Sequence, residues 1–219
     1  MTAQIPLPLE TPSRLAREDF IVGPGNSAAI GFIDAWPAWP SPAASVHGPA
    51  GSGKSHLANV WAARSGARIV EAAVLDEAVL ARNPSEPLVV ENVDHAPLTV
   101  PAEAALFALI ERGQSMLLTG REPPSVWPAR LPDLVSRFRA LLSFPLWAPD
   151  EALLETLARK LFTDRQLSVP DAVVTQMIRA VERSPAAVRD FVARADAAAL
   201  AQKRPITLGL IRELLSKDV

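Results

Sequence analysis

The sequence contains no cysteine and only three histidines, and it has no long apolar run. Without cysteine the chain can form neither disulfides nor thiolate metal sites, and three scattered histidines argue against a histidine-based metal site. No apolar stretch approaches the ~20 residues that a membrane-spanning helix needs. Residues 1–14 also lack the basic stretch and apolar core of a signal peptide, so we expect a cytoplasmic protein with no membrane partner.

The chain also lacks an excess of charge of either sign, since its net charge is -2 at pH 7 and its pI is about 6.0. This balance argues against binding of duplex DNA by a basic surface, which needs an excess of lysine and arginine. Hydrophobic residues make up 49% of the 219 residues, which is enough for a sizeable core. Length and composition therefore favour one α/β domain with a small appendage.

Residues 1–148 divide into a short tail and a domain in which strands and helices alternate. Pro6, Pro8 and Pro12 exclude a helix at the start, so residues 1–12 are predicted to form an extended tail. Within residues 13–148, helical spacing appears at 54–66 and 102–113. Short apolar segments typical of buried strands lie around them, at 45–48, 67–75, 87–93 and 115–120. The alternation predicts an α/β fold whose parallel sheet is covered by helices on both faces.

Residues 149–219 show helical periodicity throughout and no segment typical of a strand. Asp150, Ser168, Ser184 and Thr207 stand where helix N-caps belong, because their side chains can accept hydrogen bonds from the first backbone N–H groups of a helix. We therefore expect residues 149–219 to form a second, all-helical domain, a small lid that follows the α/β domain in sequence.

Residues 48–55 match the pattern G-x-x-x-x-G-K-[ST] of a phosphate-binding P-loop. Glycines allow successive backbone N–H groups to turn toward phosphate oxygens, and the helix that follows adds the positive end of its dipole. Lys54 supplies a full positive charge to the β- and γ-phosphates, and the Ser55 hydroxyl completes a Mg²⁺ shell. The motif predicts binding of ADP or ATP with Mg²⁺ by Gly48, Pro49, Ala50, Gly51, Ser52, Gly53, Lys54 and Ser55.

The acidic residues that accompany a P-loop in ATPases are altered in this chain. Glu91, at the end of a predicted strand, is a candidate for holding Mg²⁺ through water. The next residue, where a second acid would polarise the attacking water, is Asn92, and an amide is a poor base. The sequence leaves the direction of Asp94 open, and it allows Thr119 either a γ-phosphate contact or a purely structural role.

Two arginines are candidates for contacts with phosphates. Arg137 could enter the nucleotide site of a neighbouring protein as an arginine finger, which stabilises charge on the phosphoryl group in the transition state. Arg189 could fold back from the helical domain over the phosphates bound by this chain. By itself, an arginine in the place of Arg137 is more often a solvated surface residue, and the interpretation of Arg189 depends on context beyond the local sequence.

Taken together, several segments resemble the AAA+ ATPases related to the bacterial replication initiator DnaA. The similar segments are 17–26, 48–56, 118–124, 131–138 and 187–191. The resemblance implies that Arg137 is an arginine finger used in trans. It also adds residues to the predicted nucleotide site, namely Phe20, Ile21 and Val22 around adenine, His56 after the loop, and Arg189 from the lid.

Within this family the chain is most similar to the shortened relatives that inactivate the initiator. It ends at Val219, just after the predicted lid, which leaves no room for the initiator's DNA-binding domain. The tail resembles the peptide that docks on the sliding clamp, the β subunit of DNA polymerase III, through Gln4, Ile5, Leu7 and Leu9. The resemblance thus implies a nucleotide-bound protein, with ADP as the expected nucleotide, that stimulates ATP hydrolysis by DnaA and prevents re-initiation. Its partners would be DnaA and the clamp, and it would contact DNA only through the clamp. Whether the protein associates with itself is left open.

Two departures from the family bear on the protein's own ATP hydrolysis. The family usually has aspartate where this chain has Glu91, and Arg121 replaces an acid at the tip of a later strand. Both argue for weak hydrolysis and leave nucleotide binding intact. Two alternatives stay open: a self-assembling ATPase or helicase loader that uses Arg137 between its own subunits, and an adaptor that brings another partner to the clamp.

Overall fold

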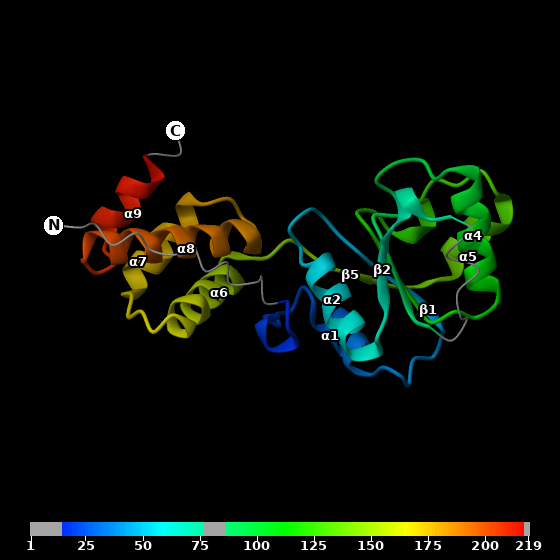
Figure 1. The fold of residues 1–219 in the computed structure, drawn as a ribbon, viewed down its shortest axis with the longest axis horizontal. Coiled ribbons are helices and arrows are strands. Elements are labelled where there is room, and N and C mark those ends of the chain that lie inside the picture. The colour runs from blue at the N-terminus through cyan, green and yellow to red at the C-terminus, as the bar shows by residue number, and fades with distance from the viewer. Residues whose placement is uncertain (1–14, 77–85, 217–219) are drawn as a thin grey trace. The chain divides into compact units, whose positions relative to one another are not determined.

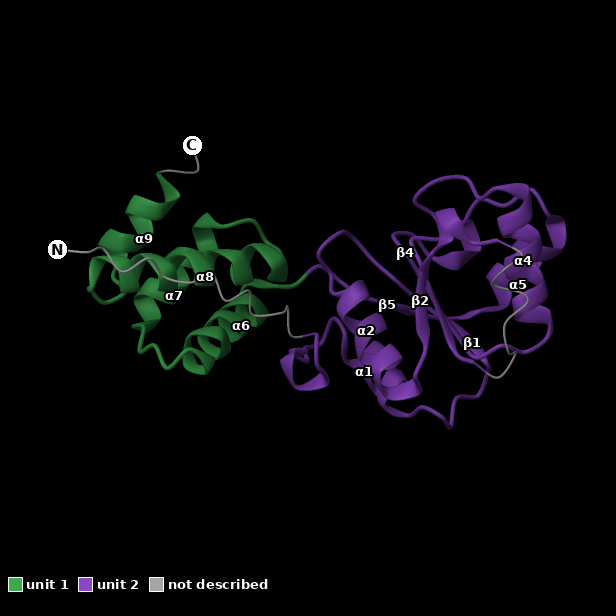
Figure 2. Ribbon diagram, in the orientation of Figure 1, with its two compact units in different colours: residues 1–14, 149–219 green, residues 15–148 purple. Residues whose placement is uncertain are grey.

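The computed structural model of the chain describes residues 15–76 and 86–216. These residues fall into two units, one of Leu15–Ala148 and one that begins at Pro149 (Figure 2). The predicted clamp peptide lies outside the described residues. Each unit is considered by itself below.

The first unit is built on a parallel five-stranded sheet with the order β2-β3-β4-β1-β5 (Figure 1). Its strands are β1 (Ala43–His47), β2 (Arg68–Glu71), β3 (Leu88–Glu91), β4 (Met116–Gly120) and β5 (Leu142–Pro145). All strands run the same way, so their carboxyl ends meet at one edge of the sheet. The predicted α/β fold with a parallel sheet is confirmed, while the edge strand β5 was not predicted.

Helices cover both faces of this sheet, as Figure 1 shows. One layer contains α1 (Ser27–Asp34) and α2 (Lys54–Ser65), and the other contains α4 (Val100–Glu111) and α5 (Pro132–Ala140). Short 3₁₀ turns lie at Arg17–Asp19, Ala72–Val74 and Pro124–Val126.

Alternate residues of each central strand pack into opposite layers. In β3, Val89 packs with the α1–α2 layer, whereas Leu88 and Val90 pack with the α4–α5 layer. In β4, Leu117 joins the first layer in the same way and its neighbour Leu118 the second. Side chains alternate between the faces of a strand, so a strand buried on both faces is apolar along most of its length.

A buried carboxylate ties α4 to the beginning of α5. Glu103 is only 4% exposed, and its oxygens accept hydrogen bonds from the backbone N–H groups of Arg130, at 3.0 Å, and Leu131, at 2.8 Å. A charged acceptor with several N–H donors is a strong interaction in a buried setting. This contact fixes where α5 begins relative to α4.

The second unit is helical throughout its described residues, in agreement with the prediction. It contains α6 (Glu151–Asp164), α7 (Asp171–Ala180), α8 (Pro185–Gln202) and α9 (Leu208–Leu215). Asp150, Ser184 and Thr207 are N-caps whose side chains accept hydrogen bonds from the first turn, as predicted. The prediction for Ser168 is wrong, because α7 begins at Asp171 and its N-cap is Pro170, which is extended and lies two positions after Ser168.

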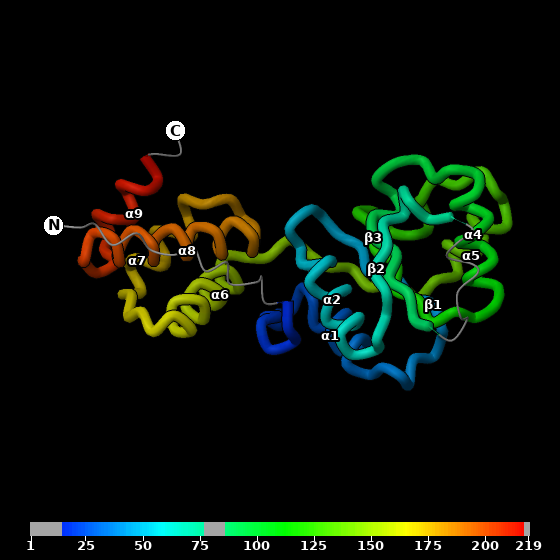
Figure 3. Tube along the Cα trace, viewed as in Figure 1, coloured from blue at the N-terminus to red at the C-terminus, as the bar shows by residue number. Residues whose placement is uncertain are grey.

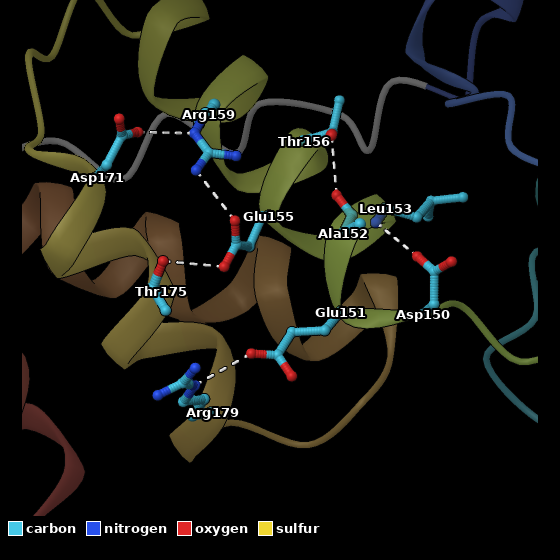
Figure 4. A network of polar contacts seen from close by, with 10 residues as sticks. All are labelled: Asp150, Glu151, Ala152, Leu153, Glu155, Thr156, Arg159, Asp171, Thr175 and Arg179. Atoms are coloured by element: carbon cyan, nitrogen blue, oxygen red, sulfur yellow. Dashed lines mark hydrogen bonds and ion pairs between the residues drawn. The ribbon is translucent and has the colours of Figure 1, made fainter.

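Surface ion pairs join α6 to α7 (Figure 4). Arg159 contacts Glu155 of its own helix at 3.0 Å and Asp171 at the start of α7 at 2.9 Å. Arg179 reaches back from α7 to Glu151 at 3.1 Å. Exposed pairs of this kind contribute about 0–1 kcal/mol each, so the apolar core does most to hold the unit together. No helix in the described ranges is long and apolar enough to cross a membrane.

Candidate nucleotide site

The predicted phosphate loop lies at the carboxyl edge of the sheet, between β1 and the beginning of α2 (Figure 3). The backbone N–H of Gly48 donates to the carbonyl of Gly120 at the end of β4, 3.2 Å away. The N–H of Ser52 bonds to the carbonyl of Pro49 at 3.3 Å, so the loop closes on itself before the helix begins. This places the helix N-terminus, with its partial positive charge, directly after the turn.

Glycine is required at both ends of this loop for different reasons. A Cβ on Gly48 would lie 2.0 Å from the carbonyl oxygen of Leu146, which no side chain tolerates. Gly53 has a φ of 101°, in the region that favours glycine, and a Cβ there would lie 3.3 Å from the ring of Phe20. Both positions leave the backbone free to approach a ligand closely.

The ammonium of Lys54 lies inside the loop. Its Nζ donates to the carbonyl oxygens of Gly48, at 2.6 Å, and Pro49, at 2.8 Å. Burial lowers the pKa of Lys54 below its usual value, and the charge of Arg121 lowers it further, while Asp94 and Glu91 act in the opposite direction. A partly buried ammonium gains stability from an anion placed beside it, so the loop suits a phosphate group.

The segment ahead of the loop packs against the base of α2. Phe20 is 7% exposed, and its ring meets the ring of His56 edge-on with centroids 5.1 Å apart. His56 Nε2 also contacts the carbonyl oxygen of Ala16 at 3.0 Å. Both side chains therefore help to hold the segment beside the loop, while Val22 is 48% exposed.

Ser55 and Glu91 are the two predicted Mg²⁺ residues, and both lie at this edge of the sheet. Ser55 is exposed in the first turn of α2, next to Lys54. Glu91 ends β3, and its Oε1 atom is buried with no hydrogen-bond partner among the described residues. Ser52 Oγ, inside the loop, is buried and unpaired in the same way. Buried polar atoms without partners are rare, and oxygen atoms here fit the preference of Mg²⁺ for oxygen and water.

Asn92, at the position where a second acid is expected from the sequence, forms hydrogen bonds through both its side chain and its backbone. Its φ is 60°, a left-handed conformation that asparagine tolerates better than most residues. The side-chain Nδ2 donates to Glu71 Oε2 at 2.9 Å, and the backbone N–H donates to Thr119 Oγ1 at 3.1 Å. Thr119 is 1% exposed, so its hydroxyl has a structural partner at the end of β3.

The structure settles the direction of Asp94, which the sequence left open. Its carboxylate accepts hydrogen bonds from the backbone N–H groups of Arg121, at 2.8 and 2.9 Å, and Glu122, at 2.7 Å. Asp94 thus fixes the turn after β4 and holds Arg121 at the same edge of the sheet as Lys54. This role was missed because the partners are 27 and 28 positions apart in sequence.

Arg137 lies away from the loop, near the end of α5. Its Nη2 forms an ion pair with Glu111 Oε1 at 2.5 Å, and the two side chains are 50% and 40% exposed. A cavity of about 190 Å³ adjoins it, lined by Phe107, Asp133, Ser136, Arg137 and Ala140. Glu111 was not identified from the sequence, in which nothing marks it as a partner of Arg137.

Arg189 lies in α8, within the helical unit, so its predicted contact with the nucleotide stays a prediction. In the described ranges no group of three or more histidine, aspartate or glutamate residues is placed to hold a metal ion without other ligands. A bound Mg²⁺ would accordingly depend on phosphate oxygens and water, as is usual for this ion.

No family model and no curated protein matches the sequence. Solved structures are similar to it in fold. Domain III of the Thermotoga maritima replication initiation protein DnaA matches with a TM-score of 0.75 and 20% identity, over 93% of this chain and 96% of that one. Replication initiator DnaA bound to AMPPCP and single-stranded DNA matches with a TM-score of 0.71 and 16% identity, over 84% and 65%.

The Thermotoga maritima RuvB Holliday junction branch migration motor is also similar, with a TM-score of 0.69 and 17% identity over 86% of this chain and 66% of that one. The chain therefore spans about two thirds of the longer relatives. At these identities the likeness establishes architecture alone. The protein shares the AAA+ fold of these structures, in which an α/β core with a P-loop is followed by a helical unit.

Proposed function

We propose that this protein binds ADP or ATP with Mg²⁺ in the phosphate loop and regulates another AAA+ ATPase. A DnaA structure of the same fold is bound to AMPPCP. In this chain, residues 48–55 would surround the phosphates, and Ser55 and Glu91 would hold Mg²⁺, the latter through water. Mg²⁺ bridges phosphate oxygens and neutralises their charge.

The observation that carries this proposal is that the phosphate loop is intact, whereas Asn92 is hydrogen-bonded to a neighbouring strand end. The loop has both required glycines and an inward Lys54. Asn92, at the position of the water-polarising acid, instead bonds to Glu71. Such a site suits a protein that holds a nucleotide without turning it over rapidly, which is the behaviour of a regulator and not of a motor.

The regulated partner that we propose is DnaA, and the role is that of Hda, the regulatory inactivator of DnaA. Arg137 would complete the active site of ATP-bound DnaA as an arginine finger. It is half exposed on a helix whose inner side chains, Leu134 and Phe138, are at most 1% exposed, so a rigid element presents it to solvent. The Gln4–Leu9 segment would tether the protein to the sliding clamp, and its prolines lower the cost of ordering an extended peptide.

The direct test measures hydrolysis of DnaA-bound ATP with the protein and with clamp loaded on DNA, each alone and together. We expect stimulation only when both are present. Equal hydrolysis in all four mixtures would refute the regulatory role, while calorimetry with ADP tests the nucleotide site separately. The experiment should be run with the protein loaded with ADP and, separately, with ATP, because the proposed site accepts either nucleotide.

A self-assembling ATPase is the second candidate, and the likeness to the RuvB motor favours it. In that case Arg137 would act between copies of this chain. Turnover by the purified protein at ~1 per second or more, on the general scale of enzymes, would support this candidate and contradict the first. Dependence of that turnover on protein concentration would show assembly.

A further inference from the structure

Two large apolar side chains near the phosphate loop are exposed to solvent. Trp147, just after β5, is 67% exposed, and Val22, in the segment ahead of α1, is 48% exposed. Tryptophan is the costliest of the apolar side chains to leave in water, so an exposed one next to a candidate site is informative.

Trp147 packs directly on the Gly23–Asn26 turn. Its backbone N–H donates to the carbonyl of Gly25 at 3.1 Å. A Cβ on Gly25 would lie 3.1 Å from Trp147 Cβ and 3.5 Å from its Cδ1, so the tryptophan side chain occupies the space above this glycine. The turn itself is fixed by Asn26, whose Oδ1 accepts from Gly23 N and whose Nδ2 donates to the carbonyl of Ile21, both at 2.9 Å.

The two segments that carry Trp147 and Val22 also touch the two ends of the phosphate loop. Leu146, next to Trp147, has the carbonyl oxygen that lies against Gly48. Phe20, two residues before Val22, has the ring that lies against Gly53. The segments that carry the two exposed apolar side chains therefore adjoin the two ends of the loop that would hold the phosphates of a nucleotide.

We propose that Trp147 stacks on the base of the bound nucleotide, with Val22 contributing apolar contact. This inference rests on the proposed nucleotide binding and adds the residue that recognises the base. An aromatic base has apolar faces, and stacking on a tryptophan is favourable whichever base is present. Trp147 thus raises affinity for nucleotides over phosphates alone, and purines gain more than pyrimidines because their ring system is larger.

The first test separates the base from the phosphates by calorimetry with Mg-ADP and Mg-pyrophosphate. Trp147→Ala should weaken ADP binding about tenfold, in line with losses measured for single stacked aromatics, and leave pyrophosphate binding unchanged. Trp147→Phe should retain most of the affinity. Val100→Ala removes a similarly exposed apolar side chain, 64% exposed at the start of α4, and should change neither ligand.

The second test uses the fluorescence of Trp147 itself. Trp61 and Trp127 are at most 3% exposed, and Trp36 and Trp39 are partly buried around Trp61. Stacking of a base on Trp147 should therefore change the emission of the most exposed tryptophan. We expect a change on addition of ADP, none on addition of pyrophosphate, and loss of the ADP response in Trp147→Phe.

Three outcomes would overturn the inference. ADP affinity equal in Trp147→Ala and wild type would exclude stacking. An equal loss of ADP and pyrophosphate would mean that Trp147 only supports the turn and the loop. Failure of the wild-type protein to bind either ligand would contradict the proposed nucleotide site itself, whereas the first two outcomes contradict only the role of Trp147.

Discussion

Replacement of Arg137 by alanine should separate stability from function. The ion pair with Glu111 joins two side chains that are 50% and 40% exposed, and exposed pairs contribute about 0–1 kcal/mol to the free energy of unfolding. Leu134 and Phe138, both at most 1% exposed, anchor α5 instead. We expect Arg137→Ala to lower the free energy of unfolding by no more than about 1 kcal/mol.

Stimulation of DnaA should respond on a larger scale. Removal of an arginine finger lowers the rate by ~10³-fold, which corresponds to a loss of ~4 kcal/mol of transition-state stabilisation. Arg137→Lys should restore little, because a point charge does not reproduce the planar guanidinium with its paired donors. ADP binding should be unchanged, since Arg137 lies away from the loop of its own chain.

Glu111→Gln is the matched control, because it removes the ion pair and keeps the arginine. Urea unfolding of the three variants, together with hydrolysis of DnaA-bound ATP in the presence of loaded clamp, forms the assay. The reasoning fails if Arg137→Ala stimulates normally, or if Glu111→Gln loses stimulation as completely as Arg137→Ala does. A loss of stability of several kcal/mol in Arg137→Ala would instead make the residue structural.

Three further expectations concern other parts of the chain. Lys54→Ala should lose measurable ADP binding in calorimetry, and unchanged affinity would contradict the loop assignment. Glu103→Gln should lower the free energy of unfolding by about 1–3 kcal/mol, because it weakens charged hydrogen bonds at a site only 4% exposed; a two-state urea transition at the wild-type midpoint would contradict this. Deletion of residues 1–10 should abolish clamp capture without moving that midpoint, and undiminished capture would refute the docking peptide.

Features encoded by contiguous residues could be predicted from the sequence. β3 and β4 are buried on both faces, so they appear as apolar runs, and the phosphate loop is a single uninterrupted motif. β5 was missed because its four residues, Leu142–Pro145, are exposed or only half buried at the edge of the sheet. Such a segment carries neither an apolar run nor a clear alternation.

Contacts between distant segments could not be predicted in the same way. Asp94 bonds to backbone groups 27 and 28 positions away, and backbone donors leave no trace in residue identity. Glu111 meets Arg137 across the packed helices α4 and α5, which the hydrogen bonds of the buried Glu103 also connect. The sequence could therefore nominate candidate residues, whereas the contacts of Asp94 and Arg137 depended on how separate elements pack.

Asn92 shows why the altered acid is part of the architecture of this site. β2 and β3 are paired so that Glu71 and Glu91 are in register at their carboxyl ends. Asn92 follows directly and donates to Glu71 at 2.9 Å, which connects the two strand ends. An aspartate at the same place would set two carboxylates against each other, and like charges at this distance repel. With Glu71 present, asparagine connects the two strand ends without adding a further negative charge, and Glu91 remains an acid whose charge acts on Lys54.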